Sequence, residues 1–408
     1  MKILFLSDNF PPEVNAPASR TFEHCKAWVK AGHQVTVITC APNFPKGRVY
    51  DGYKNRLWSR EEVDGVCVIR VWSYITANEG FLKRILDYVS FMFSASVAGL
   101  FVKRPDVIVG TSPQFFTACA AWFLGLVRRR PYVFELRDLW PESIRAVSAM
   151  KESRLLDWLE KLELFLYRKA AMVVSVTQSF KQNLEGRGID ADKIHVITNG
   201  VDLSRFQPMA KDAELSDQLG LAGKYVAGYV GTHGLAHALE TIIEAGRILQ
   251  EQGIGDEFRL ILLGEGARKH ALKQMAEDSG VTNVVFLDSV PKDEVPRYWS
   301  VLDASIIHLK ATPLFETVIP SKLFESMGMG LPVLHGVQGE SAQIVRDTGA
   351  GIVFESENAQ ALAAALLKLK QDDQLQAELR ASCLDGAQQY ERNQLAGRMA
   401  ALLQQVAV

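Results

Sequence analysis

Short apolar runs alternate with longer amphipathic stretches along most of the chain. Five runs in the first half are rich in Val, Ile and Phe, as buried parallel strands are: ILFLS, QVTVITC, DVIVGTS, PYVFEL and MVVSVT. Helical patterns lie between them, such as SRTFEHCKAWVKAGH, which contains Gly32 where a helix is expected to end. This order predicts an α/β fold in which right-handed crossovers build a parallel sheet with helices on both faces.

A second series of strand-like runs follows Asn199-Gly200-Val201-Asp202 and reads YVAGYVG, FRLILLG, NVVFLD, ASIIHL, PVLHG and GIVF. The chain therefore predicts two doubly wound, Rossmann-like domains, residues 1–203 and 204–385. We expect the helical tail, 386–408, to cross back to the first domain. The default ligand site of such a protein is a crevice at the carboxyl ends of the strands.

The composition argues for a soluble globular protein and against several classes of binding protein. Of the 408 residues, 48% are hydrophobic and 23% charged, as in a soluble globular protein. The net charge of −2 gives no global field that would attract nucleic acid. Five scattered cysteines without a CxxC spacing argue against a disulfide framework or a zinc site. Met1 leads directly into a short strand, so we expect a cytoplasmic protein.

Residues 80–104, GFLKRILDYVSFMFSASVAGLFVKR, allow two interpretations. They predict one long helix packed on the sheet. Alternatively, a Phe-rich face with Phe91 and Phe93 and the basic ends could lie on the cytoplasmic face of an anionic inner membrane, with Arg128-Arg129-Arg130 adding charge.

The segment Pro313–Val333, PLFETVIPSKLFESMGMGLPV, carries the most chemical information. Ser321 is a predicted N-cap of a helix over 322–329, which places Lys322 beside unpaired backbone N–H groups and the positive end of the helix dipole. Such a position suits a pyrophosphate. Glu325, one turn further on, could accept the two hydroxyls of a ribose. The alternative is that Lys322 and Glu325 form a surface ion pair.

Glycine-containing turns follow two strands of the second series. In GYVGTHGLAHALE, Gly231 and Gly234 allow the backbone to approach a phosphate, although such glycines also serve geometry alone. His233 and His237 could donate to phosphate, or could be solvated loop residues. Gly264 and Gly266, in LLGEG, are candidates for lining the nucleotide; they lack the third glycine of a dinucleotide fingerprint.

Two loops of the first domain open onto the same edge. In FPPEVNAPASR, Asn15 and Arg20 are candidates for polar contacts to an acceptor, the alternative being a rigid Pro-rich turn without a ligand. In ELRDLWPES, Asp138 is the carboxylate most expected at the site, ahead of Glu135 and Glu142. The alternative there is an internal pairing of Arg137 with Asp138 or Glu135.

These segments together resemble the retaining GT-B glycosyltransferases of family 4, within the branch of N-acetylfucosamine transferases of surface-polysaccharide synthesis. Five segments carry the resemblance: FPPEVNAPASR, ELRDLWPES, NGVDLSRF, GYVGTHGLAHALE and the segment around Lys322. The resemblance implies a nucleotide-diphosphate sugar donor, UDP-linked and carrying an N-acetylated hexosamine or deoxysugar. It also implies a glycan or polyprenyl-diphosphate-linked acceptor and no redox cofactor.

The resemblance also implies site residues, with departures from the family pattern. A glutamate pair usually lies eight positions apart; the first would fall on Thr317, and the nearest acid is Glu316. Thr232 and His237 stand where an Arg and a Lys are usual, and Arg137 replaces a histidine beside Asp138. The implied catalytic residues are Asp138, Arg137, Lys322 and Glu316, and Asp138 is the carboxylate that the resemblance implies will touch the sugar. The implied donor-binding residues are Gly231, Thr232, Gly234, Gly264, Gly266, Thr317, Ser321, Lys322, Leu323 and Glu325.

The implied reaction is attack on the same face of the sugar from which the diphosphate departs, with a phosphate oxygen taking the acceptor's proton. Lys322, helix starts and backbone amides would meet the leaving charge without a metal. Asp190-Ala191-Asp192 has the DxD form of some metal-binding transferases, but it is predicted to cap a turn. Two alternatives stay open: a non-hydrolysing UDP-sugar epimerase, and a non-catalytic scaffold of a polysaccharide assembly complex.

Overall fold

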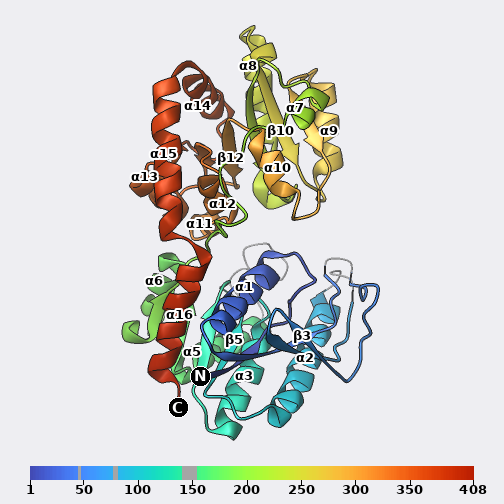
Figure 1. Cartoon of the computed structure of the whole chain (residues 1–408), viewed down its shortest axis with the longest axis vertical. Coiled ribbons are helices and arrows are strands. Elements are labelled where there is room, and N and C mark those ends of the chain that lie inside the picture. The colour runs from blue at the N-terminus through green and yellow to red at the C-terminus, as the bar shows by residue number, and fades with distance from the viewer. Residues whose placement is uncertain (45–46, 77–80, 140–153) are drawn as a thin grey trace. The chain divides into compact units, whose positions relative to one another are not determined.

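The computed structural model describes residues 1–44, 47–76, 81–139 and 154–408. The chain divides into two compact units, Met1–Thr198 with Arg392–Val408, and Asn199–Glu391 (Figure 1). The boundaries predicted at 203 and 386 lie a few residues from these. The difference arises because Val201 pairs with Glu391, which places both residues in the second unit.

The first unit is an eight-stranded sheet with the strand order β3-β4-β2-β1-β5-β6-β7-β8. Its strands are β1 (Lys2–Leu6), β2 (Gln34–Cys40), β3 (Trp58–Val63), β4 (Val66–Val71), β5 (Val107–Thr111), β6 (Tyr132–Leu136), β7 (Met172–Ser175) and β8 (Ile194–Val196). Its helices are α1 (Ala16–Lys30), α2 (Phe81–Phe101), α3 (Phe115–Arg128), α5 (Arg154–Lys169), α6 (Gln178–Gly186) and α16 (Arg392–Val406). All neighbouring strands are parallel except β3 and β4.

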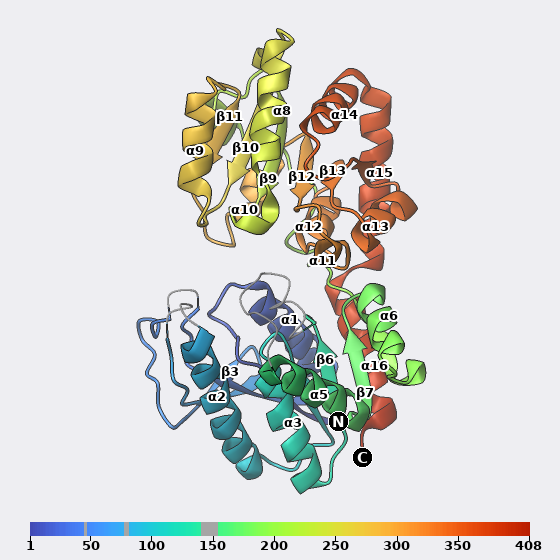
Figure 2. The ribbon, with the colours of Figure 1, turned by 180° about the vertical axis from the view of Figure 1, so that it is seen from behind.

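Alternate residues of the strands in this sheet face two different cores, since successive side chains of a strand point to opposite faces. Leu4 and Leu6 pack in the core that α2, α3, α5 and α6 cover. Ile3 and Phe5 pack with α1 and α16 in the other. Figures 1 and 2 show these two helical layers from opposite sides.

The β3–β4 hairpin is absent from the strands predicted above. Strand β3 is an edge strand with alternating burial and pairs antiparallel to β4. The turn between them, Asp64-Gly65, has φ values of +48° and +80°. An Asp-Gly pair between two alternating runs is a strong hairpin signal, so the sequence did contain the information.

The second unit is a six-stranded parallel sheet with the order β11-β10-β9-β12-β13-β14. Its strands are β9 (Tyr225–Val230), β10 (Phe258–Leu263), β11 (Val284–Leu287), β12 (Ala304–His308), β13 (Val333–Gly336) and β14 (Gly351–Val353). They correspond to the six predicted runs. Its helices are α7 (Ala213–Gln218), α8 (Glu240–Glu251), α9 (Lys269–Asp278), α10 (Val295–Ser300), α11 (Pro313–Glu316), α12 (Lys322–Gly328), α13 (Glu340–Thr348), α14 (Ala359–Gln371) and α15 (Asp373–Gln389).

Each sheet has one point at which the strand order reverses. It lies between β1 and β5 in the first unit and between β9 and β12 in the second. Loops that leave the carboxyl ends of strands at such a point diverge, and ligands of doubly wound proteins bind there. The residues that follow β1, β9 and β12 are therefore placed where a site is expected.

The last helix of the chain belongs to the first unit. The Trp28 indole on α1 donates to the main-chain oxygen of Ala396 on α16 at 2.8 Å. Arg392 forms an ion pair with Glu23 of α1. Both contacts join residues far apart in sequence, so α16 completes one face of the first sheet.

Helix α2 packs on the sheet through one face only. Phe91, Ala95 and Ala98 are buried in the core, as the packed-helix interpretation predicts. Phe93, on the opposite side of the helix, is 63% exposed. The two phenylalanines that were grouped on one face above therefore have different environments.

Candidate active site

Two loops at the carboxyl edge of the second sheet lie against each other. The amide of Gly231, after β9, donates to the Leu263 oxygen at 2.9 Å, and the amide of His233 donates to the Glu265 oxygen at 2.8 Å. A Cβ on Gly264 would lie 1.8 Å from the Gly231 oxygen, and one on Gly266 would lie 2.3 Å from the His233 oxygen. Gly264 and Gly266 are thus required by the approach of two backbones, which is the geometric alternative considered for such glycines.

The side chain of Lys322 reaches the first of these loops from α12. Its Nζ lies 3.6 Å from the centroid of the Tyr229 ring, within cation–π range. The same nitrogen lies 2.6 Å from the position that a Cβ on Gly231 would occupy, where φ is +147°. The structure therefore brings Lys322 and Gly231 together, and the missing side chain at position 231 makes room for the amine.

Burial lowers the pKa of Lys322 to about 7, while the carboxylate of Glu325 opposes the shift. Within the described part of the chain, no carboxylate lies within ion-pair distance of the Lys322 nitrogen. The surface ion pair with Glu325, proposed as an alternative, is therefore not formed. The amine is desolvated and titrates near neutral pH, unlike an ordinary surface lysine.

Two histidines lie beside the same tyrosine. The ring centroids of His233 and His237 are 6.1 Å and 5.8 Å from that of Tyr229. His233 is 0% exposed, so its interpretation as a solvated loop residue is wrong. Neither of its ring nitrogens, nor Nδ1 of His237, has a hydrogen-bond partner among the residues described.

Burial lowers the pKa of each of these histidines to about 4, and the charge of Lys322 adds to the shift. Both rings are therefore neutral at physiological pH. His308, at the end of β12, holds the histidine loop in place: its Nδ1 lies 2.8 Å from the His237 oxygen, and its Nε2 accepts from the Glu357 amide at 2.9 Å. The Lys322 amine and the rings of His233 and His237 therefore lie close together, and three of the ring nitrogens have no hydrogen-bond partner among the described residues.

The start of α12 differs from its prediction. Ser321 occupies the N-cap position, but its side chain makes no capping hydrogen bond. The helix is seven residues long and ends at Gly328. Leu323 is fully buried in the core, so only its main chain could meet a donor. The side chain of Lys322, rather than the start of the helix, is therefore the feature that could meet an anion.

The remaining predicted donor residues lie on loops of the second unit. Thr232 is exposed, and its main-chain oxygen accepts from the Tyr229 hydroxyl at 2.9 Å. Gly234 precedes the short helical turn that holds His237. The Thr317 hydroxyl donates to the Leu314 oxygen at 2.7 Å, and Glu316 is exposed at the end of α11. No contact assigns Glu316 or Thr317 to a sugar, so these roles remain predictions.

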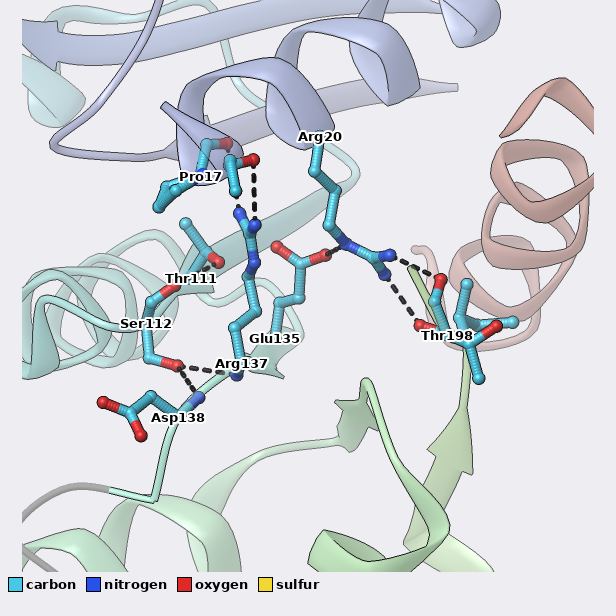
Figure 3. Close-up of polar contacts among 10 residues, drawn as sticks. Pro17, Arg20, Thr111, Ser112, Glu135, Arg137, Asp138 and Thr198 are labelled. Atoms are coloured by element: carbon cyan, nitrogen blue, oxygen red, sulfur yellow. Dashed lines mark hydrogen bonds and ion pairs between the residues drawn. The ribbon is translucent and has the colours of Figure 1, made fainter. Parts of the chain in front are cut away.

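In the first unit, Arg20 and Glu135 form a buried ion pair (Figure 3). The Arg20 Nε lies 3.0 Å from Glu135 Oε1, and the two side chains are 6% and 1% exposed. The guanidinium also donates to the main-chain oxygens of Thr198 and Ile197 at 2.6 and 2.9 Å. Burial alone would raise the pKa of Glu135, but Arg20 and Arg137 outweigh it and hold the pKa below its ordinary value.

Arg20 therefore anchors the end of the first unit. Asn15 has a similar framework role: it caps α1 by accepting from the Ala18 amide at 2.8 Å, and its amide group donates to Asn9 at 2.6 Å. These internal contacts fit the alternative of a rigid turn, and the acceptor contacts of both residues stay predictions. The loop expected at Ala16–Ala18 is the first turn of α1.

Arg137 pairs with neither of the carboxylates considered above. Its guanidinium donates to the main-chain oxygens of Ala16 and Pro17, both at 3.1 Å. The amides of Arg137 and Asp138 both donate to the Ser112 hydroxyl, at 2.7 and 3.2 Å. Figure 3 shows the Asp138 carboxylate directed away from Arg137, so these two side chains do not pair, whereas the charge of Glu135 does act on Arg137. The sugar contact of Asp138 stays a prediction.

Two further sequence features have clear outcomes. Asp190 accepts from the Asp192 amide at 3.0 Å and caps a short helical turn, which confirms the capping interpretation of the DxD sequence. Glu142 lies outside the described residues.

Comparison with known proteins gives the same division of the chain. Residues 18–205 match the family described as Glycosyltransferase Family 4, and residues 211–388 match the family Glycosyl transferases group 1. One relative, named as a colanic acid biosynthesis glycosyl transferase, WcaI, of Escherichia coli K12, is 26% identical over 90% of this chain and 91% of its own length. The amylovoran biosynthesis glycosyltransferase AmsK of Erwinia amylovora is 30% identical over 51% of this chain and 49% of its own length.

Solved structures show that the fold is GT-B. Anabaena HepE, solved in complex with UDP and glucose, superposes with a TM-score of 0.73 at 18% identity over 99% of both chains. WaaG, described as a glycosyltransferase of lipopolysaccharide biosynthesis, superposes with a TM-score of 0.69 at 15% identity over 98% of this chain and 99% of its own. Identities this low establish the architecture and leave the substrates open.

Proposed function

Because this chain belongs to the family 4 and group 1 glycosyltransferases, we propose that it transfers a sugar from a nucleotide-diphosphate donor with retention of anomeric configuration. The donor is UDP-linked and carries an N-acetylated hexosamine or a deoxysugar such as N-acetylfucosamine. The acceptor is a glycan or a lipid-linked sugar of surface-polysaccharide synthesis. The names of the relatives WcaI and AmsK support this setting.

One observation carries the proposal: the Lys322 amine lies over the Tyr229 ring and beside Gly231, with no carboxylate of the described residues at ion-pair distance. A desolvated cation of this kind is costly unless an anion completes it. The diphosphate of a sugar nucleotide is such an anion. Its negative charge grows as the anomeric bond breaks, so the amine would stabilise the departing group more than the bound donor.

The remaining residues take roles around that contact. Glu325, half-buried one turn beyond Lys322, is proposed to accept the hydroxyls of the ribose. The acceptor oxygen attacks the face from which the diphosphate leaves, and a phosphate oxygen receives its proton. No carboxylate nucleophile is needed in this scheme, in contrast to a retaining hydrolase. Metal independence is part of the proposal and is tested by adding a chelator.

The first experiment replaces Lys322 by Met and measures transfer from UDP-sugars to a panel of acceptors. We expect turnover to fall by at least about a hundredfold, the usual cost of losing one group that stabilises a developing anion. Lys368→Met, at an exposed lysine on α14, is the control and should keep wild-type rates. Wild-type turnover in the Lys322 variant would contradict the assignment.

Two measurements separate the alternatives. Incubation of a UDP-sugar in acceptor-free buffer distinguishes an epimerase, which would change the sugar without an acceptor. Binding of UDP without transfer to any acceptor would instead favour a scaffold. The anomeric configuration of a transferred sugar, read by NMR, decides between retention and inversion.

A further inference from the structure

The outer side of α2 in the first unit carries a stripe of exposed apolar side chains. Phe93, Val97 and Phe101 are 63%, 57% and 77% exposed. Leu86, two turns before Phe93, is exposed as well. The spacings of seven, four and four residues place all four on one side of the helix. The stripe lies opposite the face that Phe91 buries.

Helix α3 extends this surface. Leu126 and Val127, near its end, are 64% and 50% exposed. The ends of the two helices are joined, because the Arg128 guanidinium donates to the main-chain oxygen of Val102 at 2.9 Å and also to that of Leu100. Figures 1 and 2 both show α2 and α3 side by side. We call the exposed apolar residues Leu86, Phe93, Val97, Leu100, Phe101, Phe123, Leu126 and Val127 the α2–α3 patch.

The charge around the α2–α3 patch is predominantly positive. Residues 81–130 contain seven basic and two acidic residues, whereas the whole chain has a net charge of −2. Five of the basic residues are exposed at the ends of the two helices: Lys83, Arg84, Lys103, Arg104 and Arg129. Apolar side chains rimmed by exposed cations are complementary to the surface of an anionic bilayer.

A spanning helix is the wrong description of α2. By length and composition, Lys83–Phe101 could cross a membrane, with 22% of its apolar window buried inside the protein. That buried share includes Phe91, Ala95 and Ala98, which belong to the core shared with α3. Inserting α2 across a bilayer would remove these side chains from the folded unit. The helix can therefore meet a membrane only along its outer side.

A second copy of the chain fits this surface less well. A two-fold symmetric interface sets the same patch of both copies against each other. The basic residues that rim the patch would then face their own counterparts, which is electrostatically unfavourable. An anionic partner removes that repulsion.

We propose that the α2–α3 patch docks on the surface of an anionic lipid bilayer, with α2 lying along the interface and the basic residues at its ends contacting headgroups. This inference does not depend on which donor the enzyme uses. It places the first unit, as a peripheral domain, on the membrane that would present a lipid-linked acceptor.

Co-sedimentation with vesicles tests the proposal on the full chain. We expect binding to vesicles of phosphatidylcholine with phosphatidylglycerol, weaker binding to phosphatidylcholine alone, and loss of binding at high salt. The variant Phe93→Ser, Phe101→Ser, Leu126→Ser should lose at least about tenfold in partitioning because three apolar contacts are removed. Its melting temperature should stay near the wild-type value, since all three side chains are exposed. Met209→Ser, at a similarly exposed methionine of the second unit, is the matched control.

A Trp reporter gives a second readout. In Val97→Trp, brominated phosphatidylglycerol should quench the indole, and in Met209→Trp it should not. Equal partitioning of the triple variant and the wild type would overturn the proposal. So would a wild-type dimer in sedimentation that dissociates in the triple variant while neither protein binds vesicles, because that result assigns the patch to a second copy.

Discussion

Binding of a nucleoside diphosphate should be coupled to proton uptake at Lys322. In the free protein, burial lowers the pKa of this amine to about 7. A bound diphosphate places negative charge beside the nitrogen and raises the pKa back above its free value. Below pH 7 the amine is already charged, and binding takes up no proton at this group. Above pH 7 the proton must be acquired, so affinity falls as pH rises.

The magnitude follows from the pKa. At pH 8 about nine-tenths of the free amines carry no proton, so binding of UDP should take up about 0.9 proton per site. Affinity should fall roughly tenfold per pH unit above 7, until the pKa of the complex is reached. The phosphate does not complicate the measurement, because its last ionisation lies near pH 6.

Isothermal titration calorimetry of UDP binding at pH 8, in Tris and in HEPES, measures this uptake through the different ionisation enthalpies of the two buffers. Lys322→Arg is the matched variant: the guanidinium stays charged, so binding should take up no proton at this position and should be flat in pH. Lys269→Arg should behave as wild type, because Glu265 and Asp288 already hold the pKa of that lysine above its ordinary value. Equal proton uptake in the wild type and in Lys322→Arg would refute the reasoning.

Three further predictions concern stability and can be measured by differential scanning calorimetry. Gly264→Ala should lower the free energy of unfolding by more than about 2 kcal/mol, because its Cβ would lie 1.8 Å from the Gly231 oxygen. Gly397→Ala, in open space on α16, is the control and should raise that free energy by about 0.5–1 kcal/mol. Equal effects of the two substitutions would contradict the role of the loop contact. Arg20→Met leaves Glu135 as a buried, unpaired carboxylate and should lower the free energy of unfolding by about 3–5 kcal/mol. Adding Glu135→Gln removes that charge and should restore part of the loss. A double variant less stable than Arg20→Met would show that the unpaired charge is not the cause. Phe91→Ala should cost about 3–5 kcal/mol because the side chain is fully buried; a loss below about 1 kcal/mol would contradict its place in the core.

The parallel strands could be predicted from sequence because both faces of each sheet are covered. Runs such as FRLILLG and ASIIHL are continuously apolar for that reason, and all six strands of the second unit were identified. The edge strand β3 was missed because WSREEV alternates and is half exposed. Its signal is local, in the turn Asp64-Gly65, rather than in hydrophobicity. Strand β4, VCVIRV, is apolar and buried and was missed although it carries the same signal as the other inner strands.

The chemistry at the loop ends could be predicted only in part. The pattern around Lys322 indicated a helix start and a phosphate-binding amine, but a pattern cannot show that the nitrogen lies over Tyr229, because that contact depends on how α12 and β9 pack. Arg20 and Asn15 looked like ligand residues because they are polar and follow the first strand. The structure gives both of them internal partners, and nothing in the local sequence distinguishes the two cases.

The burial of His233 could not be predicted from the local sequence. This residue follows a strand in a glycine-rich turn, where most histidines are solvated, yet the second loop covers it completely. Gly264 and Gly266 permit that cover by letting the two backbones approach. Burial of the Lys322 amine and of both histidine rings lowers all three pKa values. Above pH 7 these three groups therefore carry little charge until an anion enters. The site should therefore bind a nucleoside diphosphate more tightly than a monophosphate. The monophosphate carries less negative charge and raises the pKa of the Lys322 amine less.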